Sequence, residues 1–389
     1  MPREAVEDLL LLSGCLDEVR EERRASAMPA VREVLDAMPG EPFDPVEVVN
    51  GMIAAGLRGD SAFWRARYVA TGRRLVSALC GGGGHGPPDM TDLPPQRFRV
   101  EIQRTFDLSR APVRRLRLPL PLEGPHLTDL EVKVGAGGLE VRLTPGRMEA
   151  LVAGPGQDAV TLSAQAAFVA RPVSPYGLEA GPVPSEAWLA PVEGPIRVTP
   201  AVAALADQLA GARRDPFDAV MAFRDHLLDA MACGRVYADA LEGEAATDWV
   251  LAHRWYDCRL GSALLAALCR ARGIPARLVG GYLLWEAPSE HYWMEAWIPD
   301  RGWTPFDLLA WDLSAGGRDR DWRGVYAGAL DYRLTTQQFP QVFTGPPGPS
   351  MRGPWHRLSR MTAGGTETRL ISIPDGALIY AERLSVVRA

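Results

Sequence analysis

Residues 255–277 read WYDCRLGSALLAALCRARGIPAR, and this stretch decides the fold. Alanines dominate it, and leucines recur at every fourth position, at Leu260, Leu264 and Leu268. This pattern is typical of an amphipathic α-helix built from residues with high helix propensity. Asp257 is a natural N-cap, and glycine and proline follow the run. The sequence therefore predicts a helix of about 14 residues that begins at Cys258 and ends before Gly273.

The predicted helix start places the thiol of Cys258 among unpaired backbone amides. These amides and the positive end of the helix dipole stabilise a thiolate, and they can also receive a developing oxyanion. The negative charge of Asp257 opposes part of that stabilisation. A second partner for the thiol is therefore needed, because an isolated cysteine at this position would be explained equally well as an inert buried thiol.

The sequence HYWMEAWI at residues 291–298 alternates as a β-strand does. One face carries His291 with two tryptophans and a glutamate, and the other face is apolar and belongs to the core. A turn at residues 299–302 returns the chain as the simplest antiparallel partner. If odd positions pair with odd ones, Asp307 shares the face of His291 and lies opposite or diagonal to it. A register slip of one residue would destroy this arrangement.

A carboxylate beside His291 would fix the tautomer of the imidazole and stabilise its cation, while the other ring nitrogen takes the proton of Cys258. Cys258, His291 and Asp307 are thus predicted to act as nucleophile, base and orienting group. Taken singly, the histidine could be a core residue and the aspartate a solvated turn residue. Asp300 and Asp312 are possible substitutes for Asp307, but the first sits in the turn and the second lies further along the chain.

Several motifs in this part of the chain belong together. They are Asp257-Cys258 opening an Ala/Leu helix, Arg270-Ala271-Arg272-Gly273-Ile274-Pro275-Ala276-Arg277 before Gly281-Tyr282, His291-Tyr292-Trp293-x-Glu295, and Gly302-Trp303-x-x-x-Asp307. With them, the segment from about Thr199 to Thr344 resembles the catalytic core of the transglutaminase-like superfamily of papain-type thiol enzymes. The resemblance implies Cys258 as nucleophile, His291 as base and Asp307 as third member.

The sequence departs from the family where Tyr256 replaces the glycine that often precedes Asp-Cys. Trp255, Tyr256 and Tyr237 are candidates for the side chain that supplements the oxyanion hole. Trp293 and Trp303 are candidates for lining the substrate, because aromatic residues crowd the predicted site and could wall a water-poor tunnel around a thioester. The alternative is that these aromatic residues pack the core.

We predict no metal and no cofactor. Animal transglutaminases need calcium, but no loop carries the dense alternating acidic run of a calcium site. The five cysteines, at positions 15, 80, 233, 258 and 269, include no C-x-x-C pair, so a structural zinc site and the zinc-binding relatives that remove glycans are disfavoured.

Charge and hydropathy exclude further classes. The chain has 389 residues with 42 basic and 48 acidic side chains, a net charge of −6 that would attract neither nucleic acid nor an anionic membrane. No run approaches the ~20 apolar residues that span a bilayer. The apolar run at residues 9–12 is too short for a signal-peptide core. The cysteines are few and odd in number, which is not typical of a secreted disulfide framework. We therefore expect a cytoplasmic protein.

The predicted fold class is α+β, with a papain-like or transglutaminase-like core in which the cysteine helix packs on an antiparallel sheet carrying the histidine and aspartate. Changes in periodicity and runs of glycine and proline set the boundaries. The predicted units are an N-terminal helical unit (1–80), a Gly/Pro linker (81–97), a β-sandwich domain (98–175), a Pro-rich connector (176–198), the catalytic domain (199–345) and a C-terminal β extension (346–389). The extension reads as two strands around a Pro-Asp-Gly turn and is expected to join a larger sheet.

The predicted reaction is acyl transfer. Cys258 attacks an acyl donor to form a thioester, and an amine takes the acyl group as an amide. The donor is expected to be a small molecule, a peptide or a carrier-protein thioester, the last in natural-product biosynthesis. One alternative is a cysteine peptidase or amidase that hydrolyses an amide with the same triad. A second is a binding or scaffold module without catalysis.

Overall fold

The computed structural model describes residues 29, 32–41, 43, 93–109, 115–124, 126–152, 158–173, 181–190, 196–233, 236, 245–284, 289–310, 320–339, 356–361, 366–372 and 379–389. Most of the predicted N-terminal helical unit and Gly/Pro linker lies outside these residues. Of that unit, residues 32–36 are helical, and Leu35 and Phe43 are buried in the same core cluster as the helices between residues 200 and 271.

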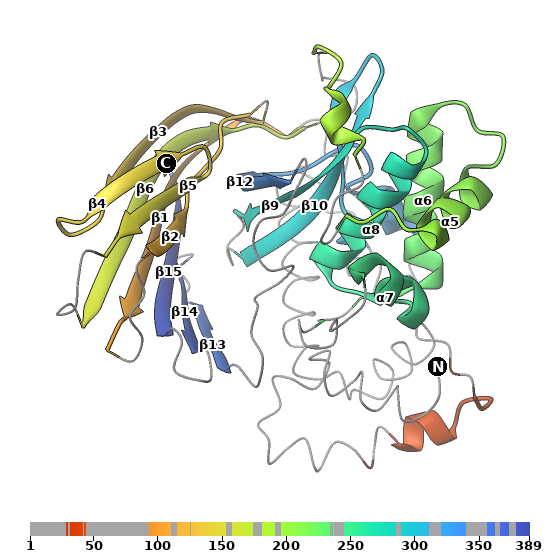
Figure 1. The fold of residues 1–389 in the computed structure, drawn as a ribbon, viewed down its shortest axis with the longest axis horizontal. Helices are drawn as coiled ribbons and strands as arrows, with labels where there is room; N and C mark the ends of the chain where they lie inside the picture. Colours follow the sequence, from red (N-terminus) through yellow and green to blue (C-terminus); the bar gives the residue numbers. More distant parts are fainter. Residues whose placement is uncertain are drawn as a thin grey trace.

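Three layers lie side by side in the described part of the chain (Figure 1): a β-rich layer, a four-stranded sheet and a layer of helices. The β-rich layer contains β1 (Gln96–Asp107), β2 (Arg115–Pro119), β3 (Leu127–Gly135), β4 (Glu140–Thr144), β5 (Arg147–Leu151), β6 (Ala159–Ala170), β13 (His356–Met361), β14 (Thr366–Ser372) and β15 (Ile379–Arg388). The middle sheet contains β9 (Ala276–Leu283), β10 (Ser289–Ile298), β11 (Gly302–Phe306) and β12 (Arg333–Phe339).

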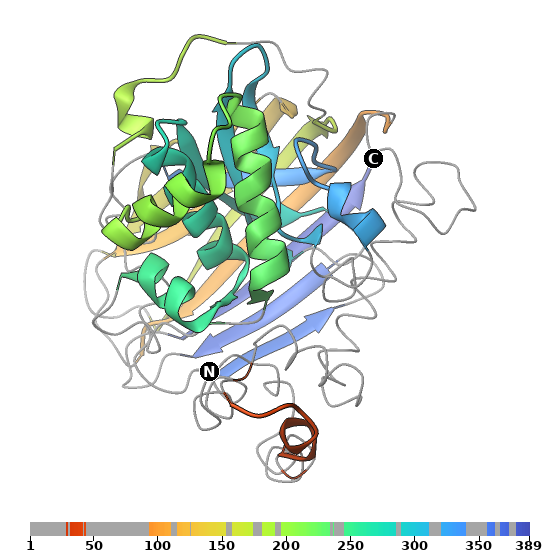
Figure 2. The ribbon, with the colours of Figure 1, turned by 90° about the vertical axis from the view of Figure 1, so that its right-hand side faces the viewer.

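The helical layer covers the outer face of that sheet and lies in front of the strands in Figure 2. It contains α5 (Pro200–Ala210), α6 (Pro216–Ala230), α7 (Ala246–His253) and α8 (Cys258–Ala271). The remaining short elements are the 3-10 helices η2 (Glu186–Trp188) and η4 (Arg320–Gly324), and the paired two-residue strands β7 (Ala232–Cys233) and β8 (Trp255–Tyr256). No helix among the described residues is both long enough and apolar enough to cross a bilayer.

The β-rich layer is made of two sheets that share one core. Its strand orders are β13-β14-β15-β1-β6-β3 and β2-β5-β4. Apolar residues of both sheets belong to a single buried cluster, which includes Phe98, Leu118 and Met148. The predicted C-terminal strands do join a larger sheet: β15 pairs antiparallel with β1, and β14 pairs with β15. The last strand of the chain is therefore part of the sheet that begins at residue 96.

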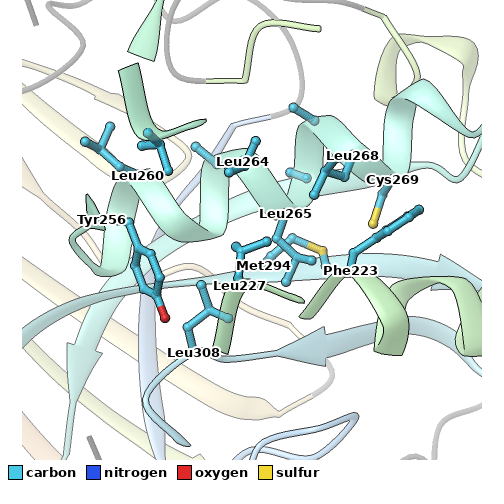
Figure 3. Packing of buried hydrophobic residues seen from close by; sticks show 14 of the residues in the cluster. Phe223, Leu227, Tyr256, Leu260, Leu264, Leu265, Leu268, Cys269, Met294 and Leu308 are labelled. Atoms are coloured by element: carbon cyan, nitrogen blue, oxygen red, sulfur yellow. The ribbon is translucent and has the colours of Figure 1, made fainter. Parts of the chain in front are cut away.

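Helix α8 spans 14 residues from Cys258 to Ala271, as the leucine spacing predicts. Leu264, Leu265 and Leu268 are fully buried, and they pack against Met294 of β10 and against Phe223 and Leu227 of α6 (Figure 3). Cys269 is buried in the same cluster. Because the cysteine helix packs on an antiparallel sheet that carries His291 and leads into Asp307, the predicted fold class is confirmed.

The strand register also has the predicted parity. In the β10–β11 pair, Trp297 faces Trp303 and Glu295 faces Pro305, so odd positions pair with odd ones. Continuing this register by two residues places Asp307 opposite Trp293, and therefore diagonal to His291. The other face of β10, with Met294, meets the helices.

The middle sheet also contacts the β-rich layer. Tyr282 of β9 and Leu334 of β12 belong to the buried cluster of the β-rich layer. The amide of Leu122 donates to the carbonyl oxygen of Thr335 at 2.7 Å, and Nε2 of the buried His126 lies 2.8 Å from the Thr335 hydroxyl. The sheet that carries His291 is thus packed between the helices and the β-rich layer.

Candidate active site

Cys258 is the first residue of α8, and Asp257 caps the helix. The Asp257 carboxylate accepts a hydrogen bond from the amide of Leu260 at 2.7 Å and another from the amide of Arg259. Its carbonyl oxygen accepts the amide of Gly261 at 2.9 Å. Of the amides in the first turn, that of Cys258 itself is the one that these contacts do not use. It is therefore the backbone donor available to an oxyanion that forms next to the sulfur.

His291 and Asp307 form a buried pair. Nε2 of His291 lies 3.0 Å from Oδ1 and 2.9 Å from Oδ2 of Asp307. The residues are 7% and 1% exposed, so little water competes for the contact. Because the carboxylate accepts, Nε2 carries the proton, and Nδ1 is the nitrogen left to take a proton from a thiol.

The thiol of Cys258 meets strand β10 next to this pair. The backbone amide of Tyr292, the residue after His291, hydrogen-bonds to the sulfur. Asp307 is also near enough for its charge to act on the thiol. The structure thus brings the start of α8, the histidine strand and the aspartate together, although Cys258 precedes both His291 and Asp307 by more than thirty residues.

Burial and negative charge keep the thiol protonated at rest. Burial of Cys258 raises the pKa of its thiol, and the charges of Asp257 and Asp307 raise that pKa further. The Tyr292 amide and the guanidinium of Arg259 lower it, but less. The helix start alone does not produce a thiolate here, so the sulfur needs a base during attack.

The carboxyl of Asp307 is held in its charged form. Burial alone would raise its pKa, but His291, the guanidinium of Arg333 and the amide of Leu309 together bring the pKa below its usual range. The Leu309 amide donates to Oδ1 at 2.8 Å, and Arg333 forms an ion pair with Oδ2 at 2.9 Å. A charged Asp307 can orient the imidazole and would stabilise an imidazolium if His291 took up a proton.

Arg224 of α6 forms hydrogen bonds to the backbone of Asp307 and of the segment at residues 323–325. This fully buried guanidinium donates to three backbone carbonyls, those of Asp307, Arg323 and Val325, at 3.4, 2.6 and 2.8 Å. Burial lowers the pKa of Arg224 to about 10, and the side chain remains charged at neutral pH. The amide of Asp307 donates in turn to the carbonyl of Tyr326 at 3.0 Å, so the backbone around the carboxylate is held from both sides.

Sequence reasoning missed Arg224 and Arg333. Arg333 opens β12, a strand that the sequence analysis did not predict, and it follows the predicted triad by more than twenty residues. The sequence gives only a weak indication of its role: Arg333 is a charged residue in the run Tyr332-Arg333-Leu334-Thr335, whose other residues are typical of a buried strand. The indication for Arg224 is equally weak, because it is a charged residue in α6 among apolar residues that pack the core.

The other predicted site residues fall into two groups. Trp255, Tyr256 and Trp293 are at most 1% exposed, as expected of residues that pack the core. Trp303 is half-buried, and its ring lies 4.1 Å from the guanidinium of Arg277. Tyr237 lies outside the described residues. Substrate contact by any of the five remains a prediction.

Of the two alternative carboxylates, the one that the structure describes, Asp300, does not replace Asp307. Asp300 is exposed in the turn between β10 and β11, with a positive backbone φ of 63°. Asp312 lies outside the described residues. Within the part of the chain that the structure describes, no group of three or more His, Cys, Asp or Glu side chains is arranged to hold a metal ion.

Comparison with known proteins agrees with this geometry. Residues 203–308 match the transglutaminase-like superfamily, and the matched range contains Cys258, His291 and Asp307. A protein-glutamine gamma-glutamyltransferase of Pseudomonas aeruginosa is 26% identical over 177 residues, which is 42% of this chain and 26% of that protein. The match therefore spans about a quarter of the length of that relative.

Two solved structures are similar to this chain. A proposed cysteine protease from Cytophaga hutchinsonii is 17% identical with a TM-score of 0.47, covering 76% of this chain and 91% of its own. The periplasmic domain of TgpA from Pseudomonas aeruginosa is 18% identical with a TM-score of 0.30, covering 58% of this chain and 91% of its own. The match of residues 203–308 to the transglutaminase-like superfamily supports a cysteine enzyme.

Proposed function

We propose that this protein is a thiol acyltransferase in which Cys258 takes an acyl group from a donor and passes it to an amine. The observation that carries the proposal is the His291–Asp307 pair, with Nε2 at 2.9 to 3.0 Å from the carboxylate, beside the strand amide that contacts the sulfur of Cys258. The partial match to a gamma-glutamyltransferase favours transfer over hydrolysis.

The first half-reaction forms a thioester. Nδ1 of His291 takes the proton of the Cys258 thiol as the sulfur bonds to the acyl carbon. The carbonyl oxygen becomes an oxyanion, which the amide of Cys258 can receive. The tetrahedral intermediate then collapses and expels the leaving group, an amine or a thiol, which takes the proton back from the imidazolium. Asp307 stabilises the imidazolium between these two steps.

The second half-reaction releases the acyl group. An amine attacks the thioester and gives its proton to His291, and the sulfur leaves and recovers that proton. If water attacks instead, the product is an acid and the protein is an amidase or peptidase. The proposed donors are a glutaminyl peptide, by analogy with the relative's name, and a carrier-bound acyl thioester.

The decisive experiment traps the acyl group. The protein is incubated with a glutaminyl peptide and, separately, with an acyl-pantetheine thioester, and the adduct is located by peptide mass spectrometry. We expect an adduct on Cys258 that is absent in Cys258→Ala. Cys269, fully buried in the core, serves as the internal control and should carry none. No adduct with either donor on folded protein would favour the scaffold alternative.

Product analysis separates transfer from hydrolysis. A primary amine is added at increasing concentration, and the amide and acid products are quantified. We expect the amide fraction to rise with the amine. Acid alone at saturating amine would identify a hydrolase and overturn the proposed transfer.

A further inference from the structure

Asp307 has a second charged partner besides His291. Oδ2 of Asp307 lies 2.9 Å from Nε2 of His291 and 2.9 Å from a terminal nitrogen of Arg333. The other oxygen, Oδ1, receives the Leu309 amide. Both oxygens lie within 3.0 Å of Nε2 of the imidazole, and one of them is shared with a guanidinium. The negative charge of the carboxylate is therefore partly neutralised before the imidazole becomes protonated.

The surroundings of Arg333 fix its position. The side chain is fully buried, and its guanidinium carbon lies 5.5 Å from the ring centre of Trp293 and 5.0 Å from that of Tyr326. Asp331 is a second anionic neighbour at 3.5 Å, and it accepts the Tyr326 hydroxyl at 3.1 Å. Two aromatic rings and two carboxylates thus hold one cation behind the aspartate.

Resting on the function proposed above, we propose that Arg333 is a positioning residue that holds Asp307 against His291 and limits how strongly the imidazole retains a proton. Arg333 lies outside residues 203–308, the range matched to the superfamily. Asp331 and Tyr326, which hold Arg333, lie outside that range as well.

The sign of the effect follows from the charges. A bare carboxylate next to His291 would stabilise the imidazolium strongly, because the pair is buried. The positive charge of Arg333, 2.9 Å from the carboxylate, opposes that stabilisation. Asp331 has the opposite effect, because its negative charge offsets part of Arg333. Other titratable or charged groups that interact with the site are Asp257, Cys258, Arg259, Glu290, Arg224, Tyr292 and Tyr326, and His126 interacts with Arg333 from the β-rich layer.

A purely structural role for Arg333 makes a different prediction. If Arg333 only neutralised two buried carboxylates, its loss would lower stability and leave the protonation of His291 unchanged. Arg277 provides a matched control on the same sheet. It is also buried, with 8% exposure, and it forms an ion pair at 2.6 Å with Glu295, without a described contact to Asp307 or His291.

The experiment is an NMR titration of His291 in protein with isotope-labelled histidine. The signal is assigned by its loss in His291→Ala, and the titration is done in a Cys258→Ala background so that the imidazole titrates without the thiol. Arg333→Met should move the observed His291 titration to higher pH, because the variant lacks the cation that shares the Asp307 carboxylate. Arg333→Lys, which keeps the charge, should restore most of the original value. Asp331→Asn should move that pKa down, and Arg277→Met should leave it unchanged.

An unchanged His291 titration in folded Arg333→Met would overturn the proposal. If Arg333→Met does not fold, Asp331→Asn decides: a downward shift supports the proposal, and no shift or an upward shift overturns it. The titration is independent of the acyl-adduct assay, which uses the native thiol. If no acyl adduct forms on Cys258 but the His291 titration shifts in Arg333→Met, only the proposed acyltransferase function is rejected. If the adduct forms but the titration does not shift, only the proposed role of Arg333 is rejected.

Discussion

Asp257 has two opposed effects on the site. Its carboxylate caps α8 by accepting the Leu260 amide, and this fixes where the helix begins and where the sulfur lies. Its negative charge also raises the pKa of the Cys258 thiol. A neutral cap of the same shape would keep the first effect and remove the second.

Replacing Asp257 with asparagine should therefore make the thiol more reactive at a given pH. Asparagine is an equally good N-cap, and loss of the charge should move thiolate formation at Cys258 to lower pH by up to about one unit. The measurement is the rate of alkylation of Cys258 by iodoacetamide as a function of pH, followed by peptide mass spectrometry. Asp215→Asn is the control, because Asp215 caps α6 in the same way by accepting the Phe217 amide at 2.8 Å. An equal shift in both variants would contradict the assignment.

Asp307 should contribute stability whose pH dependence has a defined sign. Its pKa is lowered in the folded chain, so the contribution is complete above the ordinary aspartate pKa of about 3.9 and is lost as the pH falls through the folded value. Asp307→Asn breaks a buried charge pair, which typically costs about 3–5 kcal/mol at neutral pH. Urea unfolding at several pH values should show this difference between native and variant protein, and should show it shrinking in acid. A difference that stays constant down to acid pH would mean that the charge is not the cause.

The same substitution should slow catalysis. Without the carboxylate, His291 loses the group that fixes its tautomer, and general base catalysis of this kind contributes about 10²–10⁴-fold. The readout is the initial rate of Cys258 acylation, and Asp300→Asn is the control because Asp300 is exposed in the turn. A rate for Asp307→Asn equal to that of the control would exclude Asp307 from the reaction.

The sequence predicted those helices and strands whose formation depends on neighbouring residues in the chain. Helix α8 begins at Cys258, where a capping residue and a leucine period coincide, and the alternation in β10 set the face of His291. Strand β12 was missed because its partner, β9, lies some fifty residues earlier, and its pairing with Gly281 and Tyr282 has no local signature. Arg333 could not be linked to Asp307 without that pairing.

The pairing of β9 with β12 depends on the absence of a side chain at Gly281. A Cβ at this position would lie 1.9 Å from the carbonyl oxygen of Leu334, so β12 would have to move. Gly281→Ala should destabilise the protein by about 1–3 kcal/mol and displace Arg333, the neighbour of Leu334. Thermal unfolding measures the first effect, and the rate of Cys258 acylation measures the second.

Gly324→Ala is the matched control for this substitution, because nothing lies within 4 Å of the Cβ that it adds. Its melting temperature should stay close to that of the native protein. If Gly281→Ala and Gly324→Ala have the same melting temperature, the close approach of β9 and β12 does not determine the stability of the sheet.

For the whole molecule, the sequence predicted the kinds of unit better than their connections. The C-terminal strands read locally as a hairpin, yet β15 completes the sheet of β1, so residues nearly three hundred positions apart are neighbours. Alternation was also an unreliable guide to burial in this layer. Val132 and Val134 alternate as core residues would, but each is 37% exposed, because β3 is an edge strand of the larger sheet.

This connection predicts that the end of the chain supports the active site. Leu384 of β15 is 1% exposed, and its cluster includes Tyr282 and Leu334 of the catalytic sheet. Leu384→Ala should cost about 2–5 kcal/mol, whereas Val387→Ala, at a position that is 52% exposed, should change stability by less than about 0.5 kcal/mol. The loss of stability in Leu384→Ala should extend to the candidate active site, because the β-rich layer and the middle sheet share that core.

Two probes on the same samples test the coupling. Tryptophan fluorescence reports mainly on the helical layer and the middle sheet, because nine of the 11 tryptophans lie between residues 188 and 322. Circular dichroism reports on the whole chain. In Leu384→Ala both transitions should fall together with the temperature at which the fully buried Cys269 becomes open to alkylation. If circular dichroism shifts while the fluorescence and the protection of Cys269 stay at the Val387→Ala values, the β-rich layer unfolds independently, and the candidate active site does not depend on it.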